Sequence, residues 1–289
     1  TLAPGGETHL EAVAIDVHPM GGRPRRAYLR TSPEVWHKKL LAQGSGPIFE
    51  IAPCLRDHEG GPWHDLEFEM VEWYRPGGSF EDLINDVQTL INGVYEAAGT
   101  QPPQALKKYR VAQLFEAHVG ITLDPAQSRN DFVEALAKTG LKCSHDDTWD
   151  DAFFRAWISR VEPQLATMGA VVIEGYPASQ AAMATLDAQD PRFCARFEVY
   201  VDGLELANAF NELTDGAEQQ RRFESWQRER DQLGRPTYPP DPTFFAAVDT
   251  LAPTVGIALG LDRLLALALG AKDLSEVRPF RLCDLLEAT

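Results

Sequence analysis

Apolar side chains recur at every second position along residues 66–74, and this period of two predicts a β-strand. The residues that share one face of this strand are Leu66, Phe68, Met70, Glu72 and Tyr74. A carboxylate and a phenol at the end of an apolar face need polar partners if they are buried. We therefore expect the strand to leave the core near Glu72 and to enter a polar pocket.

Five further strands follow from similar patterns and from the turn residues between them. Their ranges are 27–31, 48–56, 196–201, 204–210 and 254–259. The loop 57–65 joins one pair of runs as a hairpin. Asp202-Gly203 joins another, and this dipeptide fits a type I′ hairpin turn. Most of the predicted strands are therefore paired along the chain.

Apolar residues at helical spacing predict helices between these strands. Their ranges are about 33–43, 79–98, 215–234 and 261–269, and residues 110–170 are mostly helical in pattern. Helical blocks that separate hairpin-paired strands predict an α+β fold, in which helices pack on an antiparallel sheet. Because no internal repeat or low-complexity tract appears, we expect a single domain, residues 1–289, with a helical insertion at about 110–170.

Charge and composition exclude several classes of function. The net charge of −16 repels nucleic acid at long range, so neither tRNA nor DNA is an expected partner. No run of 18 or more uncharged apolar residues occurs, and the first residues lack a secretory signal, so we expect no membrane span. Four scattered cysteines indicate reduced thiols in a cytoplasmic protein.

Two arginines lie where regular elements end or begin. Arg56 ends the strand 48–56, and Arg263 falls in the first turn of helix 261–269, where the helix dipole disfavours a cation. Gly260 leaves room for a ligand to approach the backbone. Packing alone does not require this arrangement, so the pair indicates two arginines that bind one polyphosphate. The alternative is a surface Arg263 paired with Asp262.

Polar residues gather around the end of strand 204–210 and the start of helix 33–43. Glu205, Asn208 and Glu212 surround the strand end, and two carboxylates near a polyphosphate suit Mg²⁺. Exposed carboxylates at a strand end are the alternative. Thr31-x-x-Glu34 has the spacing of a capping box, and spacing alone favours Glu34 as a helix cap.

These segments resemble motifs 2 and 3 of class II aminoacyl-tRNA synthetases. The match rests on Arg56 after a strand, the return strand with Glu72-Trp-Tyr74, and Gly260-x-Asp-Arg263. More narrowly, residues 27 to 280 resemble the lysyl-tRNA synthetase paralogs of the elongation factor P (R)-β-lysine ligase family. The motifs that carry this likeness are Thr31-Ser-Pro-Glu34, Glu72-Trp-Tyr-Arg-Pro76, Pro177-Ala-Ser-Gln180, Arg196-Phe-Glu-Val-Tyr200, Glu205-Leu-Ala-Asn208, Glu212-Leu-Thr-Asp215 and Gly256-Ile-Ala-Leu-Gly260.

The resemblance implies a class II synthetase-like antiparallel sheet of six or seven strands and a two-step reaction. An amino acid carboxylate attacks the α-phosphate of ATP, and the adenylate then acylates a lysine of elongation factor P. By similarity Arg56 holds the α-phosphate as a catalytic residue, Arg263 holds the γ-phosphate, and Glu205 holds a metal-bound nucleotide. The implied cofactors are ATP and Mg²⁺, and the implied assembly is a homodimer.

The resemblance also places each substrate among particular residues. It assigns ATP to Arg56, His58, His64, Asp65, Phe68, Glu205, Leu206, Gly260 and Arg263. It assigns the amino acid to Ser32, Glu34, Glu72, Tyr74, Asn208, Glu212 and Ala258, and Mg²⁺ to Glu205 and Glu212. Acidic residues at the amino acid site pair with the two ammonium groups of a lysine-like substrate, so Glu34 changes from a helix cap to a substrate ligand.

Ala258 narrows the choice of the expected amino acid substrate. Lysyl-tRNA synthetases usually carry Gly at the matching place, whereas the modifying paralogs carry Ala. One added methyl group reshapes the pocket floor and is worth about 1–3 kcal/mol of discrimination. The resemblance therefore favours (R)-β-lysine over α-lysine.

Two residues depart from the family pattern. His58 stands where the motif Arg-x-Glu has its glutamate, and Glu59 follows one position late. Asp65 replaces an asparagine and adds a negative charge where the nucleotide is expected, which predicts weaker ATP binding.

The chain begins after the place of motif 1, and we expect either a further N-terminal part or a different dimer. It carries no segment that resembles an anticodon-binding barrel.

Two other functions stay open. One is a stand-alone activator of a different amino acid, which acts on a carrier or a small molecule. The other is a weakly active paralog that binds a nucleotide for regulation, and His58 and Asp65 motivate it.

Overall fold

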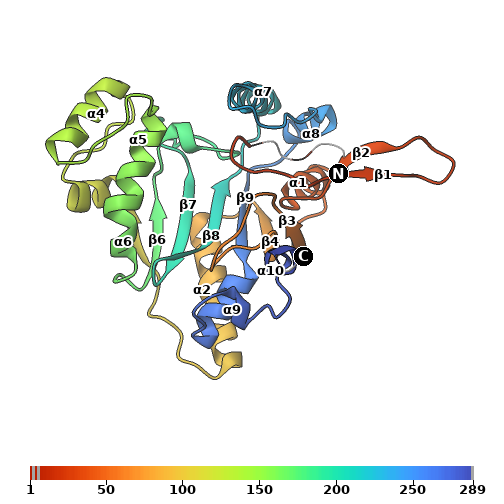
Figure 1. The fold of residues 1–289 in the computed structure, drawn as a ribbon, viewed down its shortest axis with the longest axis horizontal. Helices are drawn as coiled ribbons and strands as arrows, with labels where there is room; N and C mark the ends of the chain where they lie inside the picture. The colour runs from red at the N-terminus through yellow and green to blue at the C-terminus, as the bar shows by residue number, and fades with distance from the viewer. Residues whose placement is uncertain (2–3, 5–6, 288–289) are drawn as a thin grey trace.

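A computed structural model describes residues 1, 4 and 7–287, and a seven-stranded sheet forms its centre (Figure 1). The strands are β3 (Ile48–Leu55), β4 (Glu67–Pro76), β5 (Lys107–Arg110), β6 (Ala170–Glu174), β7 (Arg196–Val201), β8 (Leu204–Asn211) and β9 (Thr254–Gly260). Their order is β3-β4-β9-β8-β7-β6-β5. The pairs are antiparallel, as predicted, except that β5 and β6 are parallel. That edge pair escaped prediction because β5 is short and mostly charged.

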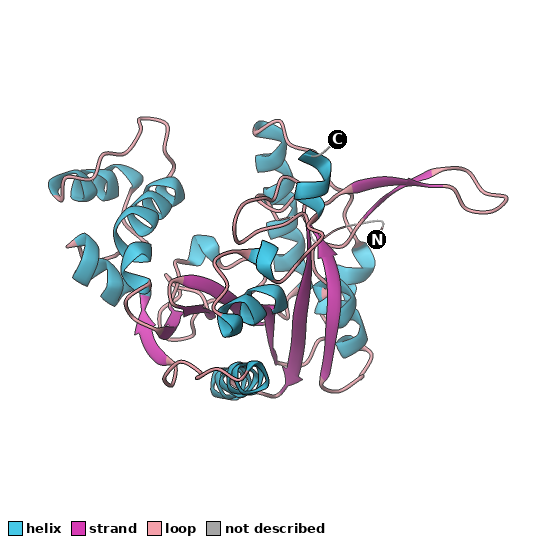
Figure 2. Cartoon of the chain, turned by 60° about the horizontal axis from the view of Figure 1, so that its bottom comes forward, coloured by secondary structure: helices cyan, strands magenta, loops and turns pink. Residues whose placement is uncertain are grey.

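The first predicted strand does not belong to this sheet. Residues 27–31 contribute only the end of β2 (Arg25–Tyr28), which pairs with β1 (Ala14–Val17) in a separate hairpin. This hairpin projects from one end of the molecule, and the helical insertion lies at the other end (Figures 1 and 2). Most side chains of β1 and β2 are exposed, so no apolar alternation marks the pair in the sequence.

The helices that the sequence predicts are confirmed within about two residues of their ends. They are α1 (Glu34–Ala42), α2 (Phe80–Ala98), α7 (Gly216–Gln232) and α9 (Leu261–Leu269). Ser79 caps α2, Asp215 caps α7, and Gly270 ends α9 in the left-handed region with φ of 66°. Helix α8 (Pro242–Val248) was not predicted. No helix of the described residues is long and apolar enough to span a bilayer.

The predicted insertion at 110–170 is helical, and its aromatic side chains share one core with Val171 and Ile173 of β6. Its elements are α3 (Val111–Leu114), the π-helical turns η1 (Phe115–Val119) and η2 (Trp157–Val161), α4 (Arg129–Lys138), α5 (Trp149–Ala156) and α6 (Glu162–Leu165). Phe115 and Phe153 are buried and stack with their ring centroids 4.8 Å apart. Three short elements complete the chain: η3 (Ala178–Gln180), η4 (Leu274–Glu276) and α10 (Leu282–Glu287).

The two faces of the sheet have different roles at β4. Val71 and Trp73 point into a core that includes Leu83 and Ile91 of α2 and Leu264 of α9. Their neighbours on β4 point to the opposite face, where Glu72 and Tyr74 line a cavity. The predicted polar pocket at Glu72 and Tyr74 is confirmed, but Phe68 and Met70 of the same face also line the cavity, so this face does not leave the core at Glu72.

Candidate active site

Three central strands form the floor of this cavity. Glu72 of β4, Ala258 of β9 and Asn208 of β8 lie opposite one another in the sheet register. In the next row of the same face, Tyr74, Gly256 and Phe210 are aligned. The middle strand therefore carries small residues between two strands with large side chains, which leaves a groove along β9.

Gly256 has no space for a side chain. A Cβ atom at this position would lie 2.2 Å from Glu212 Oε1 and 2.4 Å from Tyr74 Cε1. Both distances are far below van der Waals contact, so the glycine is what allows Glu212 and Tyr74 to converge over the floor.

The cavity has a volume of about 350 Å³. All of the site residues predicted from the sequence line it except His58: Ser32, Glu34, Arg56, His64, Asp65, Phe68, Glu72, Tyr74, Glu205, Leu206, Asn208, Glu212, Ala258, Gly260 and Arg263. Segments that are almost two hundred residues apart in the chain thus meet in one place, with arginines at one end and a carboxylate cluster at the other.

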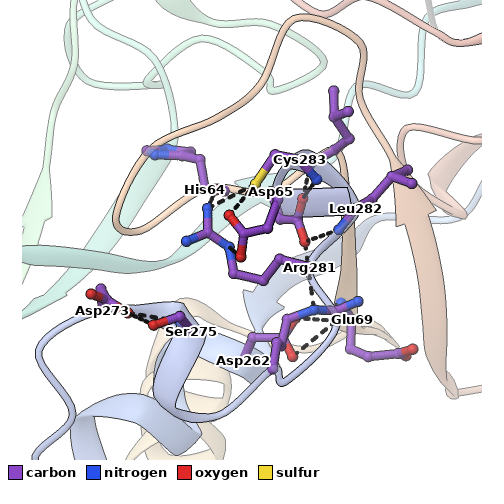
Figure 3. A network of polar contacts seen from close by, with 12 residues as sticks. His64, Asp65, Glu69, Asp262, Asp273, Ser275, Arg281, Leu282 and Cys283 are labelled. Carbon is purple, nitrogen blue, oxygen red and sulfur yellow. Dashed lines mark hydrogen bonds and ion pairs between the residues drawn. The ribbon is translucent and has the colours of Figure 1, made fainter. Parts of the chain in front are cut away.

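Arg263 points into the cavity and does not pair with Asp262. It donates to the backbone oxygens of Glu205, at 2.8 Å, and Trp63, at 3.1 Å, and its Nη2 lies 2.6 Å from His64 Nε2. Burial and Arg263 lower the pKa of His64, which favours a neutral ring that accepts this bond. Asp262 instead accepts a hydrogen bond from the backbone N–H of Glu69 (Figure 3).

Arg56 has an unused hydrogen-bonding group. Its guanidinium lies over the Phe68 ring, 5.0 Å from the centroid, and this contact fixes the orientation of the side chain. Within the described part of the chain, the buried Nε atom has no hydrogen-bond partner. A buried N–H without an acceptor is costly, so the site has room for an anion at Arg56.

His58 lies outside the cavity, which corrects its predicted place beside the nucleotide. It adopts a left-handed backbone with φ of 59°, and its exposed ring lies 3.3 Å from Glu11. The following residue, Glu59, lines the cavity. In this loop the glutamate that lines the cavity is therefore Glu59.

Asp65 is buried at the rim of the cavity, but its charge has local partners. Its carboxylate accepts hydrogen bonds from the backbone N–H groups of Leu66, Leu282 and Cys283 at 2.8–3.0 Å (Figure 3). Arg278 Nε is 3.9 Å away. The expected penalty on ATP binding has no basis in this geometry, because amides at the start of α10 already stabilise the carboxylate.

Lys38 occupies the centre of the carboxylate cluster, and the sequence reasoning missed it. Its Nζ is fully buried and lies 2.5 Å from Glu34 Oε1 and 2.7 Å from Glu212 Oε2. Burial lowers the pKa of Lys38, but the two glutamates outweigh this effect and keep the amine charged. Glu34 therefore forms an ion pair and does not close a capping box; only the Ser32 hydroxyl bonds the start of α1.

Glu72 is the third buried carboxylate. Its Oε1 accepts a hydrogen bond of 2.5 Å from the Tyr74 hydroxyl, and His37 Nδ1 is 3.6 Å away. Its Oε2 has no partner among the described residues. Burial and the nearby Glu34 raise the pKa of Glu72, so a cation in the cavity would be strongly attracted to it.

Arg196 orients the Asn208 side chain. Its Nε donates to Asn208 Oδ1 at 3.0 Å, while its other nitrogens bond Glu198 and the backbone oxygen of Gln180. Arg196 itself lines the cavity. It could have been found from the sequence, because it begins the strand that pairs with the Asn208 strand.

Glu205 and Glu212 do not act as one pair. Burial and the nearby Glu198 raise the pKa of Glu205 to about 7, and Arg263 opposes this shift. Burial likewise raises the pKa of Glu212 to about 8 against the effect of Lys38. Since the Lys38 ammonium already contacts Glu212 Oε2, the predicted metal role of Glu212 has no geometric support. No cluster of three or more potential metal ligands occurs among the described residues.

Comparison with known proteins agrees with this geometry. Residues 12–282 match the family described as tRNA synthetases class II (D, K and N). The chain is 38% identical over 266 residues to the elongation factor P–(R)-β-lysine ligase of Histophilus somni (strain 2336), which covers 91% of this chain and 80% of that protein. It is 37% identical over 277 residues to the ligase of the same name from Haemophilus ducreyi, with 95% and 82% covered. The chain belongs to the elongation factor P–(R)-β-lysine ligase family.

Membership of this family accounts for the spacing of the motifs. The resemblance to the elongation factor P–(R)-β-lysine ligase family is confirmed, and so is the class II synthetase fold. A third relative, from Proteus mirabilis, is 38% identical over 284 residues and covers 93% of this chain. The geometry adds Glu59 and Arg196 to the cavity lining, and it adds Lys38 as the partner of Glu34 and Glu212.

Proposed function

We propose that this protein activates (R)-β-lysine with ATP and transfers it to a lysine side chain of elongation factor P. The relatives named above carry this activity in their names. The observation that carries the proposal is one cavity with two arginines at one end, of which Arg56 has an unsatisfied Nε, and carboxylates at the other. Such a cavity suits a polyphosphate and a diamino acid at the same time.

The reaction follows the order of an adenylate-forming ligase. A carboxylate oxygen of the amino acid attacks the α-phosphorus of ATP, and pyrophosphate leaves with the electron pair of the broken P–O bond. A lysine amine of the acceptor then attacks the carbonyl carbon, and AMP leaves. Arg56 stabilises the α-phosphate through its free Nε, and Arg263, oriented by Trp63 and Glu205, binds the terminal phosphate.

A magnesium ion fits at Glu205. This carboxyl group lines the cavity and has a raised pKa, so its ionised form lacks a full set of partners. Mg²⁺ takes one or two carboxylates together with phosphate oxygens and water, and it neutralises charge on the polyphosphate. Glu205 therefore holds the metal in our proposal, without Glu212.

The charges at the end of the cavity away from Arg56 and Arg263 match those of a diamino acid. Glu34, Glu72 and Glu212 bring three carboxyl groups, and Lys38 balances one of them. Two ammonium groups of a substrate would balance the rest. Ala258 lies between Glu72 and Asn208 in the sheet, so its methyl group shapes the floor beneath the substrate and favours (R)-β-lysine over α-lysine.

Amino-acid-dependent exchange between pyrophosphate and ATP tests the proposal. We expect exchange with (R)-β-lysine that exceeds exchange with α-lysine, followed by transfer to elongation factor P but not to tRNA. Exchange only with a different amino acid would favour a stand-alone activator. Nucleotide binding without any exchange would favour a regulatory paralog, and either result would overturn our proposal.

A homodimer is part of the proposal. Strand β3 is an edge of the sheet, and Phe49 and Ile51 on it are 74% and 56% exposed. Trp36 on the adjacent α1 is 50% exposed. Apolar side chains on an open sheet edge favour association. Sedimentation should give a dimer that Phe49→Lys converts to a monomer; a monomeric parent protein would overturn this part.

A further inference from the structure

A fully buried arginine holds the N-terminal segment against α7. The Arg230 side chain has no exposed surface, and within the described residues its closest carboxylate oxygen is 4.0 Å away, on Glu11. Its guanidinium instead donates to backbone oxygens, which are Glu7 O at 3.1 Å, Thr8 O at 2.9 Å, Leu10 O at 3.0 Å and Pro236 O at 2.6 Å. The planar fork of five N–H donors allows one side chain to bind several carbonyls at once.

Further contacts fix the same segment. Arg235 donates to Thr8 O at 3.0 Å, and the Thr8 hydroxyl donates to Glu229 at 2.8 Å. The Tyr238 ring lies 4.5 Å from the Arg230 guanidinium, and its hydroxyl accepts the N–H of Ala12. Residues 7–12 are tied down by the end of α7 and the loop that follows it.

This clamped segment forms part of the cavity wall. Glu7 and Leu10 both line the cavity that holds Glu34 and Arg56. No ion pair joins the Glu7 carboxylate to another described residue. Burial and the nearby Glu34 raise the pKa of Glu7, whereas Arg196, Arg56 and Lys38 oppose this shift. Glu7 is therefore a carboxyl group that a cation bound between it and Glu34 would stabilise.

We propose that Glu7 is a specificity-determining residue that binds an ammonium group of the amino acid, and that Arg230 is the positioning residue that holds it at the cavity. This inference rests on the proposed function, because it assumes a diamino acid as substrate. An ammonium between Glu7 and Glu34 replaces repulsion of two carboxylates with two charge-assisted hydrogen bonds. The clamp lowers the cost of binding, because the segment is ordered before the substrate arrives.

Glu7→Gln tests the assignment with little change of shape. We expect the KM for (R)-β-lysine in the exchange reaction to rise about tenfold or more, because a charged hydrogen bond is lost. The KM for ATP should stay the same. Asp16→Asn is the control, since it removes a carboxylate charge from the exposed β1–β2 hairpin, outside the cavity and the contacts of Arg230, and its KM should change less than about twofold.

Arg230→Lys keeps the positive charge but loses the planar guanidinium that binds several carbonyls at once. Like Glu7→Gln, it should raise the KM for the amino acid. Its melting temperature must be measured alongside, because a buried arginine also supports the fold. An unchanged amino acid KM in Glu7→Gln, or a rise in the KM for ATP instead, would overturn the assignment.

Calorimetric binding of (R)-β-lysine without ATP separates this inference from the proposed function. Weaker binding by Glu7→Gln than by the parent protein supports the assignment even if exchange is absent. Equal binding by the two proteins refutes it even if exchange is strong. Absence of exchange with any diamino acid in the parent protein counts against the proposed function itself.

Discussion

The Lys38 ammonium lies 2.7 Å from Glu212 Oε2 in an ion pair that is almost completely shielded from solvent. A buried ion pair is costly to form, and removal of one partner leaves an uncompensated charge. Because Glu212 also faces the cavity, this pair connects the stability of the site to its affinity for the amino acid.

We expect Lys38→Met to destabilise the protein by about 3–5 kcal/mol, since Glu34 and Glu212 lose their shared cation. The KM for the amino acid should also rise, because the two carboxylates then repel or take up protons. Denaturant unfolding and exchange kinetics measure these effects. Lys39→Met is the control: Lys39 pairs with Asp241, and neither residue lines the cavity, so the KM for the amino acid should not change. Equal KM values for Lys38→Met and the parent protein would contradict the prediction.

Arg263→Ala should reduce exchange by about 10²–10³-fold without loss of the fold, because the substitution removes a charge that acts on the phosphates. Circular dichroism and the melting temperature check the fold, and exchange kinetics check the activity. Arg26→Ala provides the comparison, since Arg26 is exposed on the β1–β2 hairpin and pairs with Asp16. Retained activity in Arg263→Ala would refute the phosphate assignment.

Gly256→Ala should abolish amino acid binding and destabilise the protein by about 1–3 kcal/mol, because its methyl group overlaps Glu212 and Tyr74. Gly93→Ala is a matched substitution, for which we expect the opposite effect on stability. Gly93 lies in α2 with open space at its Cβ position, so alanine should stabilise the helix by up to about 1 kcal/mol. Calorimetric binding and denaturant unfolding measure both variants. Normal binding by Gly256→Ala would show that the pocket floor tolerates a side chain.

Stability and activity should respond to pH in opposite directions at Glu205. Burial raises its pKa from the ordinary 4.5 to about 7, so between these values the folded protein holds a proton that the unfolded chain has lost. The contribution of this group to stability therefore falls as pH rises from 4.5 to 7. Exchange should increase over the same interval, because only the ionised carboxyl binds Mg²⁺ well.

Melting temperatures of the nucleotide-free protein between about pH 5 and pH 8 measure the stability slope. Glu205→Gln should have a flatter slope than the parent protein and should lose the rise in exchange. Identical slopes in the two proteins would show that another group dominates. Glu69→Gln is a suitable control, because it removes a different carboxyl group from the lining of the same cavity.

The local sequence pattern was sufficient to predict the strands and helices that carry the site. The period of two along β4 correctly separates Glu72 and Tyr74 from Val71 and Trp73, because side chains alternate across a strand. The weak elements escaped because each has only four residues: β5 is mostly charged, and β1 and β2 are too short for an apolar period to be detected.

Charge partners were beyond the reach of the sequence. The spacing of Thr31 and Glu34 predicted that Glu34 caps the helix. Instead, the Glu34 carboxylate pairs with Lys38 one turn later, and Glu212, which is distant in the chain, pairs with the same lysine. The negative charge of Asp65 predicted weaker ATP binding, but the backbone N–H groups of Leu282 and Cys283 donate hydrogen bonds to its carboxylate. Glu212 and the amides of α10 are far from their partners in the chain, and contacts of that kind depend on how the chain folds.

The sequence by itself determined the strand and helix pattern, the two arginines and the family resemblance, because periodicity and motif spacing are local properties of a chain. Only the tertiary structure decided which charges meet. It placed His58 outside the cavity, set Lys38 between two glutamates, and brought Glu7 to the wall through Arg230. Electrostatic partners act over a few ångströms of space, and the fold alone determines which distant residues come that close.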